Sequence, residues 1–388
     1  MSIVKRMAAA LLGLLVLLPL PAAGEGTVRC LLVGCDRFIS MPSTFPASGN
    51  NAGIMARLLG DFLPGEVRTF IRTEGLGSAE SLAAWMEAVF RGARAEDTCL
   101  LYLSTHGVRR PETEAGMALL LSDGQTEAEL EPAVLRAMLE KLPGRKVLIG
   151  DACFSGELIG AGTEEGRDWF EGSGCEVLVS GGAGEDSWFW NADTDEYAGT
   201  GYFTSAVSNA LRASDPEQVD PDGNGWVSLE ELTARLREIH GVSTVYCAGD
   251  KKAEPLFRLP EDRKAGSLLR ALHFGELSEE GESLVLPIRF RAEEPVRVMY
   301  LLVPSLGGRW DFEHAVRLPD REKTGLVRGL LSPGEKDRTI RLPRGSLGGD
   351  GRALLQVVSI HGDVLEPWAE AGRVIEFLPP GEENTQEE

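Results

Sequence analysis

A histidine and a cysteine each stand just beyond the end of an apolar run. His106 follows the run at 98–104, and Cys153 follows the run at 146–149. A cysteine thiolate is a strong nucleophile, and a neighbouring imidazole can take its proton and later protonate a leaving amine. The two residue types therefore predict nucleophilic attack on a peptide carbonyl, provided that the fold brings them together.

Each of these runs has the features of a strand buried in a parallel sheet. Both are short, neither alternates between apolar and polar residues, and both end in glycine-containing turns. Neighbouring parallel strands lie about 5 Å apart, and ligands collect in the crevice beyond their carboxyl ends. We expect His106 and Cys153 to face one cleft there. The backbone N–H groups of Gly107 and Cys153 are expected to hold the oxyanion, since glycine lets a substrate approach the main chain.

The surrounding chain predicts the rest of such a sheet. Between residues 27 and 260, short apolar runs alternate with helical segments, one of which begins at a serine cap, Ser78. This alternation is typical of an α/β sandwich with a mostly parallel sheet. Besides the strands before His106 and Cys153, the expected strands are 28–34, 67–71, 117–121 and 176–180, and the expected helices are 50–59, 78–90, 132–142 and 228–239.

Two motifs surround the pair at a fixed spacing. Asp151-Ala152-Cys153-Phe154-Ser155-Gly156 is preceded 47 residues upstream by Ser104-Thr105-His106-Gly107. This arrangement resembles the caspase and metacaspase peptidases, and the acidic residue two before the cysteine is similar to metacaspases and bacterial relatives. Further matches lie at 31–34, 177–181 and 201–204. The resemblance covers residues 27–260 and implies a caspase-like α/β fold and a cysteine endopeptidase.

The resemblance also implies a primary pocket for the substrate side chain. Asp151 faces the same side as Cys153, and in metacaspases this position helps to bind a basic side chain. A second acid of that pocket follows an asparagine early in the first helix, where this chain has Asn50-Asn51. Asp36 is expected to substitute for it, and Ser180 to complete the pocket. No arginine stands close to Cys153 or Ser180 to bind an acidic side chain, which favours cleavage after Arg or Lys over cleavage after Asp.

A second motif predicts a metal site. Residues 220–231 match an EF-hand loop, with a glycine, Gly225, at the sixth position. Calcium prefers oxygen ligands in this pattern, and the alternative is an Asp/Gly turn that caps the following helix. The expected ligands are Asp220, Asp222, Asn224, Trp226 through its carbonyl, Ser228 and Glu231.

The N-terminus predicts export. Lys5 and Arg6 precede an apolar run at 7–20, and small residues follow at 21–24. This pattern is typical of a secretory signal peptide over residues 1–23 and is short for a membrane span. An uncleaved anchor is the alternative. We expect an exported protein, secreted, periplasmic or at the cell surface, with no integral membrane segment after cleavage.

The net charge of the chain limits the classes of partner that we expect. The chain has 388 residues and a formal net charge of −21, which becomes −23 without residues 1–23 because these carry two basic and no acidic side chains. An acidic chain without basic clusters repels phosphate, so nucleic acid is not an expected partner. The charge favours cationic peptides and divalent metal, or only keeps the protein soluble.

The sequence pattern changes in the C-terminal third of the chain. Short apolar strands separated by Gly, Pro and Asp turns predict an all-β sandwich-like domain over residues 268–378, whose partner the sequence does not name. Residues 379–388 form an acidic tail that is expected to be disordered. Six cysteines are present, and their positions in apolar runs favour reduced, buried thiols.

The sequence leaves three functions open. The first is an exported cysteine endopeptidase that acts on peptide or protein substrates. The second is a catalytically silent peptide-binding module, although binding alone gives no physical reason for a thiol beside an imidazole. The third is a cysteine hydrolase or transpeptidase acting on cell-wall peptides, which the same pair could serve.

Overall fold

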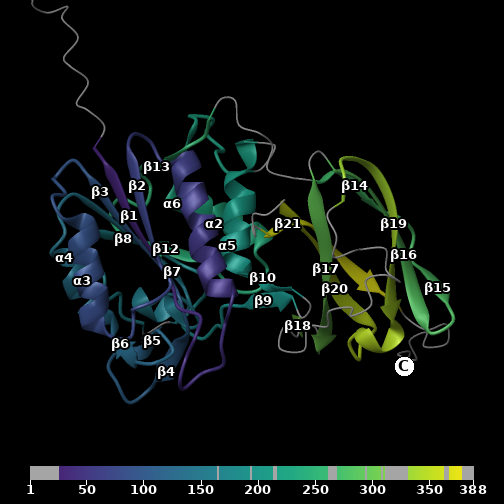
Figure 1. Cartoon of the computed structure of the whole chain (residues 1–388), viewed down its shortest axis with the longest axis horizontal. Helices are drawn as coiled ribbons and strands as arrows, with labels where there is room; N and C mark the ends of the chain where they lie inside the picture. Colours follow the sequence, from purple (N-terminus) through teal and green to yellow (C-terminus); the bar gives the residue numbers. More distant parts are fainter. Residues whose placement is uncertain are drawn as a thin grey trace, which may run out of the picture.

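The computed structural model describes residues 26–163, 166–192, 195–212, 216–260, 269–292, 295–306, 309–310, 331–361 and 367–377. These residues form an α/β part followed by an antiparallel β part, which lie side by side in Figure 1. The predicted signal peptide at 1–23 and the acidic tail at 379–388 lie outside the described residues.

A six-stranded sheet forms the centre of the α/β part. Every neighbouring pair is parallel except the one at one edge, where β12 (Tyr246–Ala248) runs antiparallel to β8 (Cys175–Val179). The predicted apolar runs form the inner strands, and almost all of their residues are buried. In spatial order the strands are β12 (Tyr246–Ala248), β8 (Cys175–Val179), β7 (Arg145–Asp151), β3 (Thr98–Ser104), β1 (Val28–Gly34) and β2 (Val67–Arg72).

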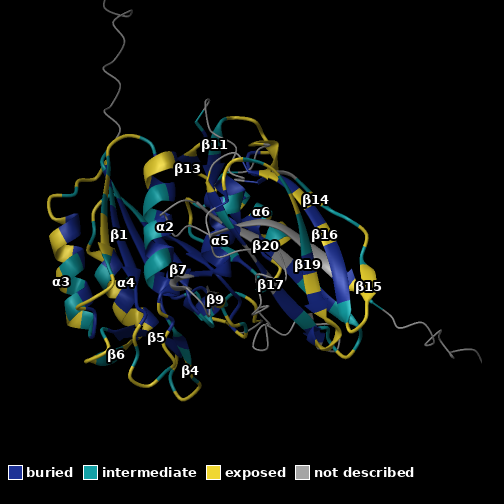
Figure 2. Cartoon of the chain, turned by 45° about the vertical axis from the view of Figure 1, so that its right-hand side comes forward, coloured by how far each residue is buried: buried dark blue, intermediate teal, exposed yellow. Residues whose placement is uncertain are grey.

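Helices cover both faces of this sheet, which is why its inner strands lack alternation. Leu32 packs in one core with α2, α5 and α6, whereas its neighbour Leu31 packs in the other core with α3 and α4. Figure 2 shows the buried strands between helices whose outer sides are exposed. The helices are α2 (Ala47–Phe62), α3 (Ala79–Phe90, with Ser78 as its cap), α4 (Pro132–Glu140), α5 (Tyr202–Leu211) and α6 (Leu229–Ile239).

Three smaller groups of antiparallel strands lie outside the six-stranded sheet in the described residues of the α/β part. The predicted strand at 117–121 lies in a separate three-stranded sheet that follows His106. These elements are β4 (Gly107–Arg110), β5 (Gly116–Ser122) and β6 (Glu127–Leu130), the hairpin β9 (Phe189–Ala192) with β10 (Asp195–Gly201), and the pair β11 (Trp226–Ser228) with β13 (Pro255–Arg258).

The C-terminal part consists of two antiparallel sheets around one shared core. Alternate residues of β16 and β19 meet those of β17 and β20 in that core, as the sandwich-like prediction requires. Strand β21 also lies against α5 and β10 of the α/β part (Figure 1). One sheet contains β14 (Leu269–Phe274), β15 (Ser278–Glu280), β16 (Ser283–Ala292) and β19 (Gly334–Pro343), and the other β17 (Val296–Leu306), β18 (Arg309–Trp310), β20 (Arg352–His361) and β21 (Pro367–Glu376).

Candidate active site

Strand register brings the predicted pair to one cavity. Ser104, the last residue of β3, lies opposite Asp151, the last residue of β7, so the segments that follow leave the sheet together. The backbone N–H of Thr105 donates to the carbonyl of Asp151 at 3.2 Å and ties the two ends. His106 and Cys153, both half-buried, line one cavity of about 430 Å³. This is the common cleft that the sequence predicts.

A sharp turn presents Cys153. Phe154, the next residue, adopts a left-handed backbone with φ of 59°, which is uncommon for a residue with a side chain. Its N–H donates to the carbonyl of Glu185 at 2.8 Å, and the Arg109 guanidinium lies 4.5 Å from its ring centroid. These contacts hold the turn in a conformation that the local sequence alone does not favour.

Gly107 packs directly against the main chain of Cys153. A Cβ at this position would lie 1.8 Å from the Cys153 carbonyl oxygen, so only glycine fits. The Leu120 N–H donates to the His106 carbonyl at 2.9 Å, just before the β4–β5 ladder, which begins where Gly107 pairs with Leu119. The His106 carbonyl thus points toward β5, and because a trans peptide group directs its carbonyl and its N–H to opposite sides, the Gly107 N–H points away from β5. It therefore does not belong to the ladder on that side, which is what the expected oxyanion donor requires.

The Cys153 sulfur contacts the backbone of Ser187. The Ser187 N–H donates to Sγ at 3.4 Å, and Sγ lies 3.5 Å from the Ser187 carbonyl. Burial raises the pKa of the Cys153 thiol to about 12; the Ser187 N–H opposes this, whereas the charge of Asp186 adds to it. The resting residue is therefore a thiol, and forming the nucleophile requires a base.

His106 is oriented by the loop that follows β1. Its Nε2 lies 2.9 Å from the Pro42 carbonyl, and its ring centroid lies 4.6 Å from that of Phe38. A carbonyl only accepts hydrogen bonds, so this contact places the imidazole proton on Nε2. Nδ1 of the neutral ring then carries the lone pair that can act as the base.

Asp151 forms a buried carboxylate on the wall of the same cavity. Its Oδ1 accepts from Ser187 Oγ at 2.8 Å, and its Oδ2 accepts from Thr204 Oγ1 at 2.9 Å and Tyr102 OH at 3.3 Å. Burial raises its pKa, and these hydroxyl donors oppose the rise. No basic side chain of the described residues pairs with it, so it is a buried acid without a cation.

Asn51 has a defined role at this acid. Its Oδ1 accepts from Thr200 Oγ1 and Gly201 N–H, both at 2.7 Å, which turns its amide nitrogen toward Asp151 Oδ2 at 3.4 Å. A carboxylate in its place would face Asp151 with like charge. Beside Asp151 the pocket of this chain therefore has an amide donor, and Asp186 is a second acid that lines the same cavity.

The structure places Asp36 and Ser180 outside this cavity. Asp36 accepts the N–H groups of Ser48 at 2.8 Å and Gly49 at 2.9 Å and so caps helix α2. Its carboxylate lines a separate cavity, so it does not occupy the place of a second acid beside Asp151. Ser180 is fully buried, and its Oγ contacts the Ala152 N–H at 3.2 Å, behind the nucleophile turn. It supports that turn and does not line the cavity.

Two residues around Cys153 and Asp151 were not predicted from the sequence. Ser187, which lines the cavity, contacts Cys153 from 34 residues away, and the buried Thr204 contacts Asp151 from 53 residues away. The aromatic run Trp188-Phe189-Trp190 is compatible in the sequence with a cleft wall or with core packing, and Trp188 and Phe189 line the cavity.

The predicted metal loop gathers three carboxylates. Oxygens of Asp220, Asp222 and Glu231 lie within 4.8 Å of one another. Glu231 Oε2 also accepts from the N–H and the hydroxyl of Ser228, both at 2.8 Å, as in a helix capping box. Among the ion pairs between described residues, none involves these three acids. Uncompensated like charges at these positions fit a divalent cation.

Sequence comparison identifies the family. Residues 27–243 match the model of the caspase domain, which is more than half of the chain. The chain belongs to the caspase-domain family. The predicted family and the predicted caspase-like α/β fold are thereby confirmed, and membership indicates a caspase-like cysteine peptidase that acts on protein.

Other comparisons are distant. No curated protein matches the sequence. A Geobacter sulfurreducens protein of known structure is 16% identical, with a TM-score of 0.40, covering 60% of this chain and 98% of its own. Caspase-1 from Spodoptera frugiperda is 14% identical, with a TM-score of 0.39. The match covers 58% of this chain and 87% of the caspase-1 chain.

Proposed function

We propose that this caspase-domain protein is an exported cysteine endopeptidase with Cys153 as the nucleophile and His106 as the base and acid. The observation that carries the proposal is the single cavity lined by both residues and by Gly107. Family membership alone does not require an active enzyme. A thiol, an imidazole and a backbone N–H that points away from the neighbouring strand, all at one crevice, are the parts that peptide hydrolysis needs.

The proposed reaction follows from these groups. His106 Nδ1 takes the thiol proton, and the Cys153 sulfur attacks the peptide carbonyl carbon. The N–H groups of Gly107 and Cys153 stabilise the oxyanion, and the imidazolium protonates the leaving amine. A water molecule, deprotonated by His106, then hydrolyses the thioester and releases the acid. Because the thiol pKa is about 12, the resting cysteine depends on His106 for activation.

We further propose that the bond cut follows an Arg or Lys residue. Among the residues that the structure describes, Asp151 is a buried carboxylate without a cationic partner, and it lies at the wall of the cavity that holds the nucleophile. An isolated charge in such a place is costly, and a basic substrate side chain would compensate it. The amide of Asn51 adds no charge beside Asp151, and Asp186 is a second acid at the same cavity.

Calcium and export complete the proposal. The residues that would hold calcium are Asp220, Asp222, Asn224, Ser228, Glu231 and the Trp226 carbonyl, and the ion would hold the start of α6 against β13 as a structural ligand. The basic and apolar pattern of residues 1–23 supports export. Within the described residues, no helix has the length and apolar character needed to cross a membrane.

One observation favours a second candidate, a silent peptide-binding module. The Cys153 sulfur is bonded to the backbone of Ser187, and its thiol is strongly disfavoured as a thiolate. A chain that only binds peptides would tolerate such a nucleophile.

The test is turnover of a peptide library by the mature chain and by Cys153→Ala. The endopeptidase predicts cleavage that the substitution abolishes, together with faster alkylation of Cys153 than of the buried cysteines, because the cavity makes it accessible. Cleavage that survives in Cys153→Ala would overturn the mechanism. Peptide binding without cleavage in either protein would favour the silent module, and transfer to an amine acceptor would indicate a transpeptidase.

A further inference from the structure

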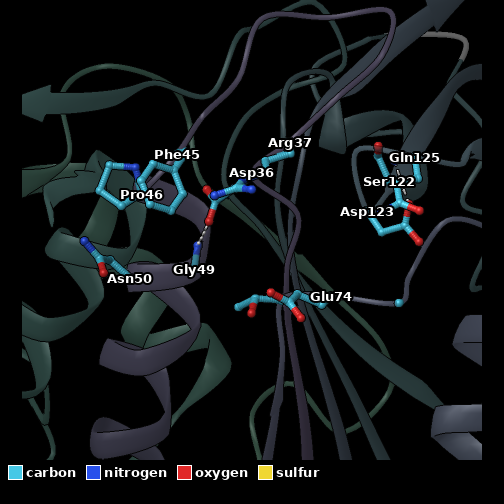
Figure 3. Close-up of a pocket in the computed structure, with 12 residues that line it drawn as sticks. Asp36, Arg37, Phe45, Pro46, Gly49, Asn50, Glu74, Ser122, Asp123 and Gln125 are labelled. Atoms are coloured by element: carbon cyan, nitrogen blue, oxygen red, sulfur yellow. Dashed lines mark hydrogen bonds between the residues drawn. The ribbon is translucent and has the colours of Figure 1, made fainter. Parts of the chain in front are cut away.

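A second cavity lies beside the catalytic one. It has a volume of about 560 Å³ and is formed by the loop after β1, the start of α2 and the turns that follow β2 and β5. Figure 3 shows Asp36 held against Gly49 on one side, Asp123 on the other, and Glu74 between them in this view. The size is that of a pocket for a small ligand or a long side chain. No step of the proposed reaction uses it.

A single hydrogen-bonded layer separates the two cavities. Thr44 and Ser48 line the cavity of Cys153, whereas Asp36 lines the second one. Thr44 Oγ1 donates to Asp36 Oδ1 at 3.0 Å, and the Ser48 N–H donates to the same oxygen at 2.8 Å. An extended peptide advances about 3.3 Å per residue. A peptide with one side chain beside Asp151 can therefore present a nearby side chain to the second cavity.

The charges lining the second cavity are mainly negative. Three carboxylates, Asp36, Glu74 and Asp123, face it with one cation, Arg37. The Glu74 side chain is exposed and makes no ion pair or hydrogen bond with any residue that the structure describes. Asp123 Oδ1 accepts the N–H groups of its own turn, at 2.9 Å from Gln125, and its Oδ2 is unbonded among the described residues. Carboxylate oxygens of two residues are thus open to a ligand.

An aromatic ring stands at the same cavity. Phe45 is 41% exposed, which is unusual for a large apolar side chain, and the Arg37 guanidinium lies 5.1 Å from its ring centroid. The contact with Arg37 shows that the ring can pack against a guanidinium. A long basic side chain could lay its apolar stem along Phe45 and place its charged head between Glu74 and Asp123.

We propose that this second cavity is a subsite for a further Lys or Arg side chain of the peptide, a few residues from the cleaved bond. The substrate class is then a peptide with two basic residues in close succession. This inference rests on the proposed endopeptidase for its readout by turnover, but not for its readout by binding.

The experiment compares reporter peptides that share one basic residue at the cleaved bond. A second lysine is moved through the neighbouring positions on both sides, and kcat/KM is measured relative to the peptide without it. In the wild type, one position raises kcat/KM about three- to fivefold at low salt, as for a partly exposed ion pair, and less at high salt. Glu74→Gln brings the ratio of kcat/KM with and without the second lysine towards one, and Glu74→Lys brings it below one. The control Glu66→Gln, at the opposite end of β2, leaves the ratio as it is.

Binding to Cys153→Ala separates this subsite from the proposed reaction. Tighter binding of the dibasic peptide that Glu74→Lys removes, without turnover by the wild type, would uphold the subsite and overturn the endopeptidase. Turnover by the wild type with no gain from a second lysine at any position would overturn the subsite alone. Absence of both turnover and preferential binding would overturn both.

Discussion

Among the single residues of the site, Cys153 and Asp151 both have an ionised form that burial disfavours. Burial raises the pKa of both the Cys153 thiol and the Asp151 carboxyl, and Ser187 contacts both side chains. A substrate that places a cation beside Asp151 would therefore act on the segment that also holds the sulfur. Ser187 is thus the residue that links the acid of the pocket to the Cys153 sulfur.

Replacing Asp151 tests the specificity at this scale. Asp151→Asn keeps the side-chain size but removes the charge, so kcat/KM for an Arg-terminated reporter should fall about tenfold or more. An Asp-terminated reporter should not lose activity, and the exposed control Asp250→Asn should change neither. Indifference of the Arg reporter to Asp151→Asn would show that the cation binds elsewhere.

The same carboxyl predicts a pH dependence. Burial raises the pKa of Asp151, so as the pH falls the side chain takes up a proton earlier than an ordinary carboxyl. The advantage of the Arg reporter over a neutral reporter should accordingly be complete above this raised pKa and fade as the pH falls through it. In Asp151→Asn this advantage should be small at every pH.

At the scale of elements, local patterns predicted the sheet and the nucleophile pair. The runs before His106 and Cys153 are buried strands because helices cover both faces, and the lack of alternation records this. Ser187, Tyr102 and Thr204 could not be predicted in the same way. They meet Asp151 because strand order and the β9–β10 hairpin bring distant segments together, and no local pattern encodes that order.

The role of Asp36 shows a second limit of local patterns. An acid just after a buried strand is compatible with a ligand site or with a helix cap. The loop of residues 37–46 places the start of α2 so that its first N–H groups face Asp36. The N–H groups of Ser48 and Gly49 donate to the Asp36 carboxylate and stabilise its negative charge. The decision between the two roles depends on loop geometry, which the sequence leaves open.

The metal loop gives the prediction at this scale. Calcium added to chelator-stripped protein should raise the free energy of unfolding by RT ln(1 + [L]/Kd), about 2.7 kcal/mol at a hundredfold excess over Kd. Glu231→Gln should remove this gain while keeping the capping box, because glutamine can accept the same bonds from Ser228. Glu230→Gln is the matched control, since Glu230 is exposed and pairs with Lys252. An equal rise in melting temperature in all three proteins would place calcium at another site.

In the molecule as a whole, the α/β part and the β part have separate cores and meet beside the cavity that Cys153 lines. The core of the β part contains residues of that part only, and the two cores of the α/β part do the same. Strand β21 nevertheless lies against α5 and β10. These elements carry Thr204, which contacts Asp151, and Gly201, which contacts Asn51. The β part therefore lies behind the wall of the catalytic cavity.

Truncation near residue 264 tests this arrangement. Because the cores are separate, the shortened chain should fold and keep a cooperative thermal transition. Because β21 no longer supports α5 and β10, KM for basic reporters should rise a few-fold, with a smaller effect on alkylation of Cys153. Circular dichroism, melting and reporter kinetics measure the three quantities. An insoluble or unfolded product would mean that the β part covers apolar surface that the α/β part needs. A folded product with unaltered KM would mean that β21 contacts the catalytic part without supporting its cavity.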